Sequence, residues 1–223
     1  MISIVIPVYN EKESIGRVVD EVRDLYPDAE IIVANDGSTD GTTEAIKSIP
    51  GIRTVSFASN KGKGFAIYEG LLASSGDICA TMDGDGQSDP RDIGRLVEAL
   101  KKADCAFGYR EKRESSISKK IGGIIGNKAR MLVLGSGATR DAGCALKAFR
   151  KGHVQHLFPF EGLHRFIPDL LAGAELSIAE LSIAERPRFA GKSKYSNSGR
   201  AVRGLSHLML IRKHLSRKMK QHA

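Results

Sequence analysis

Short apolar runs rich in β-branched residues alternate with helix-forming segments along the first 110 residues, and this alternation restricts the fold more than any other feature. The runs predict strands at residues 2–8, 31–34, 54–57, 78–82 and 106–109. Between them, apolar side chains recur three or four residues apart, which predicts helices. Nearly continuous apolar strands separated by helices form a parallel sheet covered on both faces. The sequence therefore predicts a doubly wound, mostly parallel α/β domain.

Polar clusters follow three of the predicted strands, where ligands bind in sheets of this kind. Residues 7–11 read Pro-Val-Tyr-Asn-Glu, and residues 35–40 read Asn-Asp-Gly-Ser-Thr-Asp. Asp36 can accept hydrogen bonds from a base or a ribose, although Asp-Gly is also a common turn pair. Residues 60–64, Asn-Lys-Gly-Lys-Gly, precede a predicted helix and offer an anion cradle. They match neither the Walker A loop nor the dinucleotide-binding fingerprint.

Two carboxylates end the fourth predicted strand, in the segment Asp83-Gly84-Asp85-Gly86-Gln87. Two negative charges at the end of a buried strand repel each other unless a cation lies between them. Hard oxygen ligands favour Mg²⁺ or Mn²⁺, ions that commonly also bind substrate phosphates. An EF-hand is excluded, because the glycine and glutamate spacing is wrong and Pro90 interrupts the segment. A solvated acidic turn is the alternative.

The basic residues are distributed unevenly along the chain. The whole chain carries 34 Lys and Arg against 26 Asp and Glu, a net charge of +8. Residues 186–223 hold 11 of the basic residues and no acidic ones, so the first 185 residues carry a net charge of −3. Such asymmetry points to a polyanionic partner for the C-terminal part, either nucleic acid or an anionic membrane surface. The alternative is a solvated terminal helix.

The last segment predicts an amphipathic helix. Its apolar face would carry Leu205, Leu208, Ile211, Leu215 and Met219. Its polar face would carry basic residues together with His207, His214 and His222. Such a helix can lie on an anionic leaflet. It could also pack on the domain or on a second subunit, whereas few aromatic residues are present to stack on nucleic-acid bases.

Composition excludes several classes of protein. Hydrophobic residues make up 41% and charged residues 27%, as in ordinary globular proteins. No apolar run is long enough to span a bilayer, and no charged segment precedes the first strand as in a signal peptide. The three cysteines, Cys79, Cys105 and Cys144, are scattered, which is typical of buried thiols in a reducing compartment. We therefore expect a cytoplasmic protein, peripheral on the membrane.

Taken together, these segments resemble family 2 glycosyltransferases, which have the GT-A fold. The resemblance rests on residues 7–11, 35–40, 60–64 and 83–87. Residues 163–168, Leu-His-Arg-Phe-Ile-Pro, and 188–195, Arg-Phe-Ala-Gly-Lys-Ser-Lys-Tyr, are similar to the polyprenyl-phosphate branch. That branch includes the dolichyl-phosphate mannose synthases. The resemblance covers nearly the whole chain.

The resemblance implies a role for each matching position. The nucleotide sugar would be bound by Pro7, Tyr9, Glu11, Asp36, Lys63 and Asp83. The metal on the donor diphosphate would be held by Asp83 and Asp85, the expected catalytic pair, and by the side-chain amide of Gln87. The acceptor phosphate would be clamped by Arg110, Arg188, Ser193 and Lys194. Two positions depart from the family pattern, since Asn35 replaces a common aspartate and Gly86 stands where a large apolar residue is usual.

The expected organisation is a GT-A domain over residues 1–199, followed by the basic helix at 200–223. Residues 1–110 would bind the nucleotide sugar and the metal, and residues 111–199 would bind the acceptor. The less regular second half predicts a strand, a helix and another strand at residues 144–149, 165–172 and 175–184.

The resemblance implies an inverting, metal-dependent transfer of a sugar from GDP-mannose or a UDP-hexose to dolichyl or undecaprenyl phosphate. A phosphate monoester is already an oxyanion at neutral pH, so it needs cations for positioning rather than a base. A hydroxyl acceptor would need a general base, for which Asp141 and Glu161 are candidates. A family 2 enzyme acting on a carbohydrate hydroxyl and a non-catalytic nucleotide-sugar-binding protein remain open. A homo-oligomer or a separate membrane-anchoring partner is compatible with each.

Overall fold

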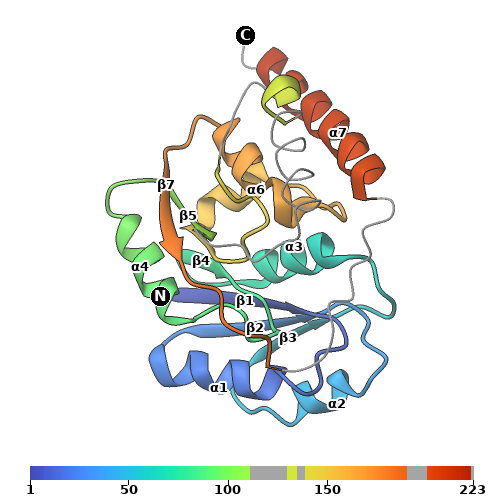
Figure 1. Cartoon of the computed structure of the whole chain (residues 1–223), viewed down its shortest axis with the longest axis vertical. Coiled ribbons are helices and arrows are strands. Elements are labelled where there is room, and N and C mark those ends of the chain that lie inside the picture. The colour runs from blue at the N-terminus through green and yellow to red at the C-terminus, as the bar shows by residue number, and fades with distance from the viewer. Residues whose placement is uncertain (111–129, 135–138, 190–199, 222–223) are drawn as a thin grey trace.

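The computed structural model describes residues 1–110, 130–134, 139–189 and 200–221, with the side chains of the last segment described at positions 204 and 206–216 (Figure 1). The strands are β1 (Ile2–Val8), β2 (Glu30–Asn35), β3 (Arg53–Ser56), β4 (Ile78–Thr81), β5 (Cys105–Arg110), β6 (Lys147–Arg150) and β7 (Ile178–Ile183). The helices are α1 (Ile15–Leu25), α2 (Thr42–Lys47), α3 (Lys63–Ala73), α4 (Arg91–Ala99), the 3₁₀ helix η1 (Lys151–His156), α6 (Leu163–Ala172) and α7 (Arg200–Gln221). Residues 130–134 form a further short helix.

The strands form one sheet in the order β3-β2-β1-β4-β6-β5-β7. Only β6 runs antiparallel to its neighbours among these strands, so the predicted mostly parallel sheet is confirmed. The predicted strand at 144–149 begins later, at Lys147. A turn causes the delay, because the Cys144 N–H donates to the Asp141 carbonyl and holds these residues out of the ladder.

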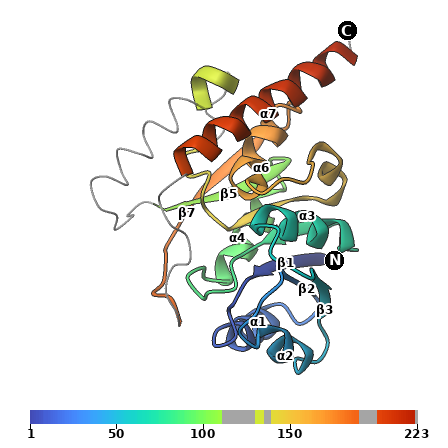
Figure 2. The same cartoon turned by 90° about the vertical axis from the view of Figure 1, so that its right-hand side faces the viewer.

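Helices cover both faces of the sheet, as the continuous apolar strands predict (Figure 2). One face packs α1 and α4 against β1 through residues such as Val19, Leu96 and Ile4. The other face packs α3, α6 and α7 together, with Leu71 and Ile211 fully buried there. The strand ends between these two layers are left to form the site.

The C-terminal helix α7 packs on the domain with part of its predicted apolar face. Leu208 and Ile211 are buried in the core beside α6, while Leu205 and Met219 have side chains outside the described set. The expectation that His207 and His214 extend the polar face is wrong. They lie four residues before and three after Ile211, so they share its buried side of the helix. There the two imidazoles contact the rings of Phe160 and Phe158, at centroid distances of 5.2 and 4.3 Å.

No helix within the described part of the chain combines the length and the apolar character needed to cross a bilayer.

Candidate active site

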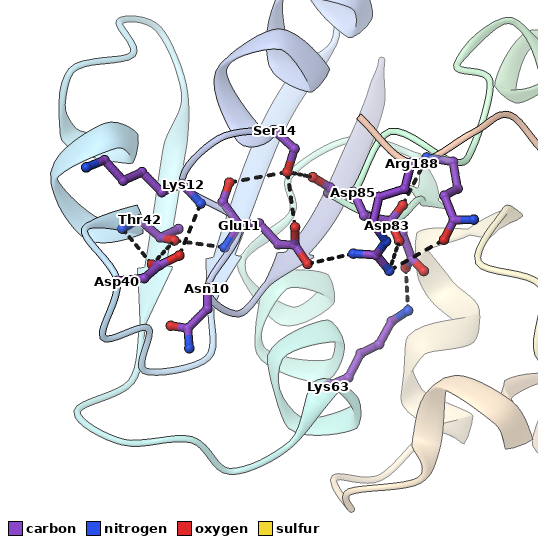
Figure 3. A network of polar contacts seen from close by, with 12 residues as sticks. Asn10, Glu11, Lys12, Ser14, Asp40, Thr42, Lys63, Asp83, Asp85 and Arg188 are labelled. Atoms are coloured by element: carbon purple, nitrogen blue, oxygen red, sulfur yellow. Dashed lines mark hydrogen bonds and ion pairs between the residues drawn. The ribbon is translucent and has the colours of Figure 1, made fainter. Parts of the chain in front are cut away.

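The carboxyl ends of three parallel strands meet at one edge of the sheet. Strand β1 lies between β2 and β4 and runs parallel to both, so the residues that follow these strands are neighbours. Glu11 follows β1, Asp36 follows β2, and Asp83 and Asp85 follow β4. Figure 3 shows the Arg188 guanidinium between Glu11 and the acidic pair, with Lys63 reaching toward Asp83.

The acidic pair after β4 is balanced by two cations. Lys63, the first residue of α3, forms an ion pair with Asp83. The Arg188 guanidinium lies 2.7 Å from an Asp85 carboxylate oxygen. Asp85 is only 7% exposed, and its burial together with the negative charge of Asp83 raises the pKa of its carboxyl. The negative charge of Asp83 thus disfavours the charged form of Asp85. A cation between the two carboxylates would relieve this repulsion.

Arg188 joins residues that the sequence assigned to different subsites. Besides Asp85, its guanidinium donates to Glu11 Oε1 at 3.2 Å and to Gln87 Oε1 at 3.4 Å. It therefore contacts two predicted metal ligands and one predicted nucleotide ligand. The backbone holds it there, since the Arg186 N–H donates to the Gln87 carbonyl and the Phe189 N–H donates to the Asp85 carbonyl.

The glycine at position 86 is required by a ring that lies against it. An ideal Cβ on Gly86 would lie 2.3 Å from Cδ2 of Phe189, and its φ of +80° is also unfavourable for other residues. The guanidinium of Arg17 covers the Phe189 ring at 3.8 Å from the centroid. An apolar ring from the distant segment thus occupies the space next to Gly86, the position where the family usually has a large apolar side chain.

Asp36 organises the glycine-containing loop before α3. Its carboxylate accepts hydrogen bonds from the backbone N–H groups of Lys61 at 2.8 Å and Gly62 at 2.9 Å. Burial raises the pKa of this carboxyl. Asn35, which replaces the family's common aspartate, donates to Thr43 and accepts from the Ser38 N–H, so it holds the turn. Asp36 is thus the carboxylate at this strand end.

Other predicted ligands lie at the same edge or apart from it. Pro7 is buried in β1 and Tyr9 is half-buried just beyond it. Arg110 binds both carboxylate oxygens of Asp141, at 2.6 and 3.1 Å, and also Glu185 at 3.0 Å. It thus belongs to a separate ion-pair group. Ser193 and Lys194 lie outside the described residues.

The candidate bases differ in their surroundings. The carboxylate of Asp141 is engaged by Arg110, as described above. Glu161 lies against the glycine loop, because an ideal Cβ on Gly62 would be 2.6 Å from Glu161 Cγ. The Gly64 N–H also donates to the Glu161 carbonyl. Glu161 is therefore the candidate base that borders the nucleotide loop.

One functional candidate, Lys147, was missed by the sequence reasoning, and a second, His164, appeared there only within the segment 163–168, without an assigned role. Lys147 of β6 is 2% exposed and donates to the Cys144 carbonyl, and burial lowers the pKa of its ammonium to about 8. His164 of α6 is half-buried, and desolvation lowers the pKa of its imidazole well below the usual value. Both line a small cavity together with Lys63 and Thr81. A lysine within the apolar run at 144–149 was the available signal, because lysine is rarely buried in a strand without a specific role.

The family is decided by the chain's match to known proteins. Residues 3–158 match the sequence model of glycosyl transferase family 2. The chain belongs to this family. The predicted family is confirmed, and the sheet of this family 2 glycosyltransferase is the α/β sheet that the strand pattern predicted.

Relatives with assigned activities match most of this family 2 glycosyltransferase. It is 32% identical over 232 residues to dodecaprenyl-phosphate galacturonate synthase of Rhizobium johnstonii, covering 97% of this chain and 68% of the relative. It is 32% identical over 219 residues to undecaprenyl-phosphate 4-deoxy-4-formamido-L-arabinose transferase of Aeromonas hydrophila, covering 94% and 64%. The chain thus spans roughly two thirds of the length of these relatives.

A solved structure shares the fold. The crystal structure of glucosyl-3-phosphoglycerate synthase from Mycobacterium tuberculosis, in complex with Mn²⁺ and UDP-glucose, superposes with a TM-score of 0.72. The sequences are 23% identical, and the match covers 95% of this chain and 78% of the other. The likeness shows that the two proteins have the same fold.

Proposed function

We propose that this family 2 glycosyltransferase moves a sugar from a nucleotide diphospho-sugar to a polyprenyl phosphate at a membrane surface. The observation that carries the proposal is the acidic pair Asp83 and Asp85 at the sheet edge, with Lys63 of α3 paired to Asp83 and Arg188 of the segment after β7 paired to Asp85. The names of the two relatives, which describe transfers to dodecaprenyl and undecaprenyl phosphate, support the choice of acceptor.

The oxygen atoms at this edge fit a hard divalent cation. Asp83, Asp85 and the Gln87 amide oxygen would hold Mg²⁺ or Mn²⁺, and the mutual repulsion of the two carboxylates would be relieved by it. When bound, such a cation stabilises the negative charge that develops on the leaving diphosphate. Lys63 and Arg188 pair with these carboxylates, so both would lie near the diphosphate and could bind its oxygens.

The donor nucleoside would lie over the ends of β1 and β2. Asp36 keeps acceptor capacity beyond its two backbone hydrogen bonds, so it can bind a base N–H or a ribose hydroxyl. Pro7, Tyr9 and Glu11 follow β1 at the adjacent position and would form the rest of this pocket.

The acceptor side is rich in cations. A phosphate monoester is an oxyanion at pH 7, so it attacks the sugar without a general base if cations hold it in line with the leaving group. Arg188 would bind it together with Ser193 and Lys194, and Lys63 and Lys147 of the small cavity add two further cations. Arg110 could contribute only by exchanging a carboxylate partner. We expect direct displacement with inversion at the sugar carbon.

A hydroxyl acceptor is the second candidate. Glu161 borders the glycine loop, so its carboxylate could remove a proton from an acceptor hydroxyl. This alternative predicts that Glu161→Gln abolishes turnover, whereas a phosphate acceptor predicts that the variant stays active.

Labelled nucleotide sugars would test the proposal. The protein is incubated with Mn²⁺, polyprenyl phosphate and a panel of GDP-linked and UDP-linked sugars, and acid-labile label is measured in the organic phase. Asp85→Asn is expected to abolish the transfer. Asp77→Asn, at an exposed carboxylate outside the site, serves as the matched control. Label found only on hydroxyl acceptors, or donor binding without any transfer, would contradict the proposal.

A further inference from the structure

Exposed apolar side chains gather on two neighbouring helices. Among the described residues, the large exposed hydrophobic side chains are Met1, Leu25, Leu72, Met131, Leu132, Met209 and Leu210. The last four lie on the helix at 130–134 and on α7, with Leu132 88% and Met131 57% exposed. Figures 1 and 2 both show these two helices side by side at the end of the molecule that lies away from β1. We call these four residues the apolar surface.

Both helices are anchored on α6, which fixes the position of the apolar surface. Arg130 Nε lies 3.2 Å from a carboxylate oxygen of the fully buried Asp169, and its guanidinium covers the Phe166 ring at 5.0 Å. Leu208 and Ile211 of α7 are buried in the same core cluster. The inward faces of both helices are therefore occupied by the domain, and the apolar surface is the side that remains exposed.

The charge next to the apolar surface is positive. Arg212 and Lys213 are exposed on α7 just after Met209 and Leu210. The sequence of α7 contains seven basic residues and no acidic one. Exposed aliphatic side chains beside a row of cations are what an anionic lipid surface binds, because the chains enter the acyl boundary while the cations meet the headgroups. The sequence of α7 offers no Phe, Tyr or Trp, the residues that dominate protein interfaces and stack on nucleic-acid bases.

The apolar surface and the small cavity lined by Lys63, Lys147 and His164 lie on different sides of α6. On α6, His164 lines the cavity with Lys63 and Lys147, whereas Phe166 and Asp169 face Arg130. An acceptor whose phosphate reaches the cavity would thus have its lipid chain one helix away from the apolar surface. This step rests on the proposed function.

We infer that the apolar surface, together with Arg212 and Lys213, docks the protein on an anionic lipid bilayer. The predicted membrane contact through the inner apolar face of α7 is replaced by contact through the outer side of α7 and the helix at 130–134. The reason is that Leu208 and Ile211 are consumed in the core.

Vesicle flotation tests this inference with the full chain. Wild type is mixed with vesicles of phosphatidylglycerol and phosphatidylcholine in equal parts, and with phosphatidylcholine alone. We expect binding to the anionic vesicles that weakens with salt. Replacing all four residues of the apolar surface by serine is expected to lower the partition coefficient at least about tenfold. Arg212→Glu with Lys213→Glu is expected to lower it by about tenfold or more, since each basic residue near the surface contributes roughly fivefold.

A matched control uses two other exposed leucines. Leu25→Ser with Leu72→Ser, on α1 and α3, should leave vesicle binding unchanged, because these side chains are similarly exposed outside the apolar surface. Thermal unfolding of every variant checks that it is folded. Wild type that does not float, or an apolar-surface variant that floats like wild type, overturns the inference. A dimer that this variant dissociates, without vesicle binding by wild type, assigns the surface to a second copy instead.

A soluble acceptor separates this inference from the proposed function. With a short-chain, water-soluble isoprenyl phosphate, the apolar-surface variant should turn over like wild type. Loss of that turnover would place the four residues in the active site and overturn the docking assignment. Anionic-vesicle binding that depends on the apolar surface, with no transfer to any phosphate acceptor, would contradict the proposed function and still support the docking surface.

Discussion

The Arg188 guanidinium lies 2.7 Å from the Asp85 carboxylate, although 102 residues separate them in the chain. The same guanidinium reaches Glu11 and Gln87, so one cation occupies the oxygen cluster that is proposed to hold a divalent ion. Arginine cannot be deprotonated in proteins, so its charge persists at every working pH. If the proposed divalent ion binds Asp85, the segment carrying Arg188 has to release that carboxylate.

Arg188→Ala is expected to change metal affinity and turnover in opposite directions. Without nucleotide, Mn²⁺ should bind about tenfold tighter, because a hydrogen-bonded cation contributes roughly 1.5–3 kcal/mol to its carboxylate. Transfer should fall, because the diphosphate and the acceptor lose a cation. Electron paramagnetic resonance of free Mn²⁺ measures the first effect without turnover. Weaker Mn²⁺ binding in the variant would show that Arg188 and the metal do not compete.

Asp85→Asn should stop turnover without unfolding the protein. Burial and Asp83 raise the pKa of this carboxyl, so the folded protein disfavours its charged form, and a neutral amide should be tolerated at neutral pH. We expect an unchanged or higher melting temperature and a loss of at least about 100-fold in kcat, the size typical for removing a preorganised electrostatic group. Circular dichroism melting and initial rates measure the two effects. Substantial retained activity would remove Asp85 from the site.

Gly86→Ala should destabilise the protein through Phe189. The new methyl group meets the ring, and the positive φ adds strain, so we expect a loss of about 1–3 kcal/mol. Phe189→Ala should cost less in the Gly86→Ala background than in wild type, because removing the ring there also removes its clash with the new methyl group. A double-mutant cycle by urea unfolding measures this coupling. Additive effects would show that the ring does not press on position 86.

Lys147 should give acceptor binding an alkaline limit. Burial lowers the pKa of its ammonium to about 8, so its charge is lost as the pH rises through that value. If Lys147 helps to hold the acceptor phosphate, the acceptor KM should rise between about pH 7 and 9 while the donor KM changes little. Lys147→Arg should remove the rise, since arginine stays charged. Lys147→Met should have a high acceptor KM at every pH, and a wild-type profile in this variant would exclude the role.

Asp169 should make stability depend on pH in a defined direction. Its burial raises the pKa of the carboxyl from 3.8 to about 6 in the folded protein. Its contribution to stability is therefore fully present below about pH 3.8 and is lost as the pH rises through about 6. Between pH 4 and pH 7, the free energy of unfolding of Asp169→Asn should therefore rise relative to that of wild type, by on the order of 3 kcal/mol. Urea unfolding at pH 4 and pH 7 measures the difference, and a constant difference would contradict the assignment.

The sequence was sufficient for the positions of the first five strands along the chain and for the place of the acidic pair after the fourth. Their signals are local, because an apolar run marks a buried strand and Asp83 and Asp85 follow such a run directly. The position of Lys147 was also local, but its importance was not visible. A lysine within an apolar run was a signal in the sequence, but only the structure shows that this lysine is buried and lines a cavity with Lys63 and His164.

Sequence periodicity by itself determined which segments are strands or helices and which residues end the strands, because those properties depend on neighbours a few positions away. Only the tertiary structure decided that β6 enters antiparallel between β4 and β5, that Arg188 reaches Asp85, and that Leu208 and Ile211 of α7 face the core. Each of these depends on which distant segments lie against each other. An amphipathic pattern shows that a face is apolar, but it does not show whether protein or lipid covers that face.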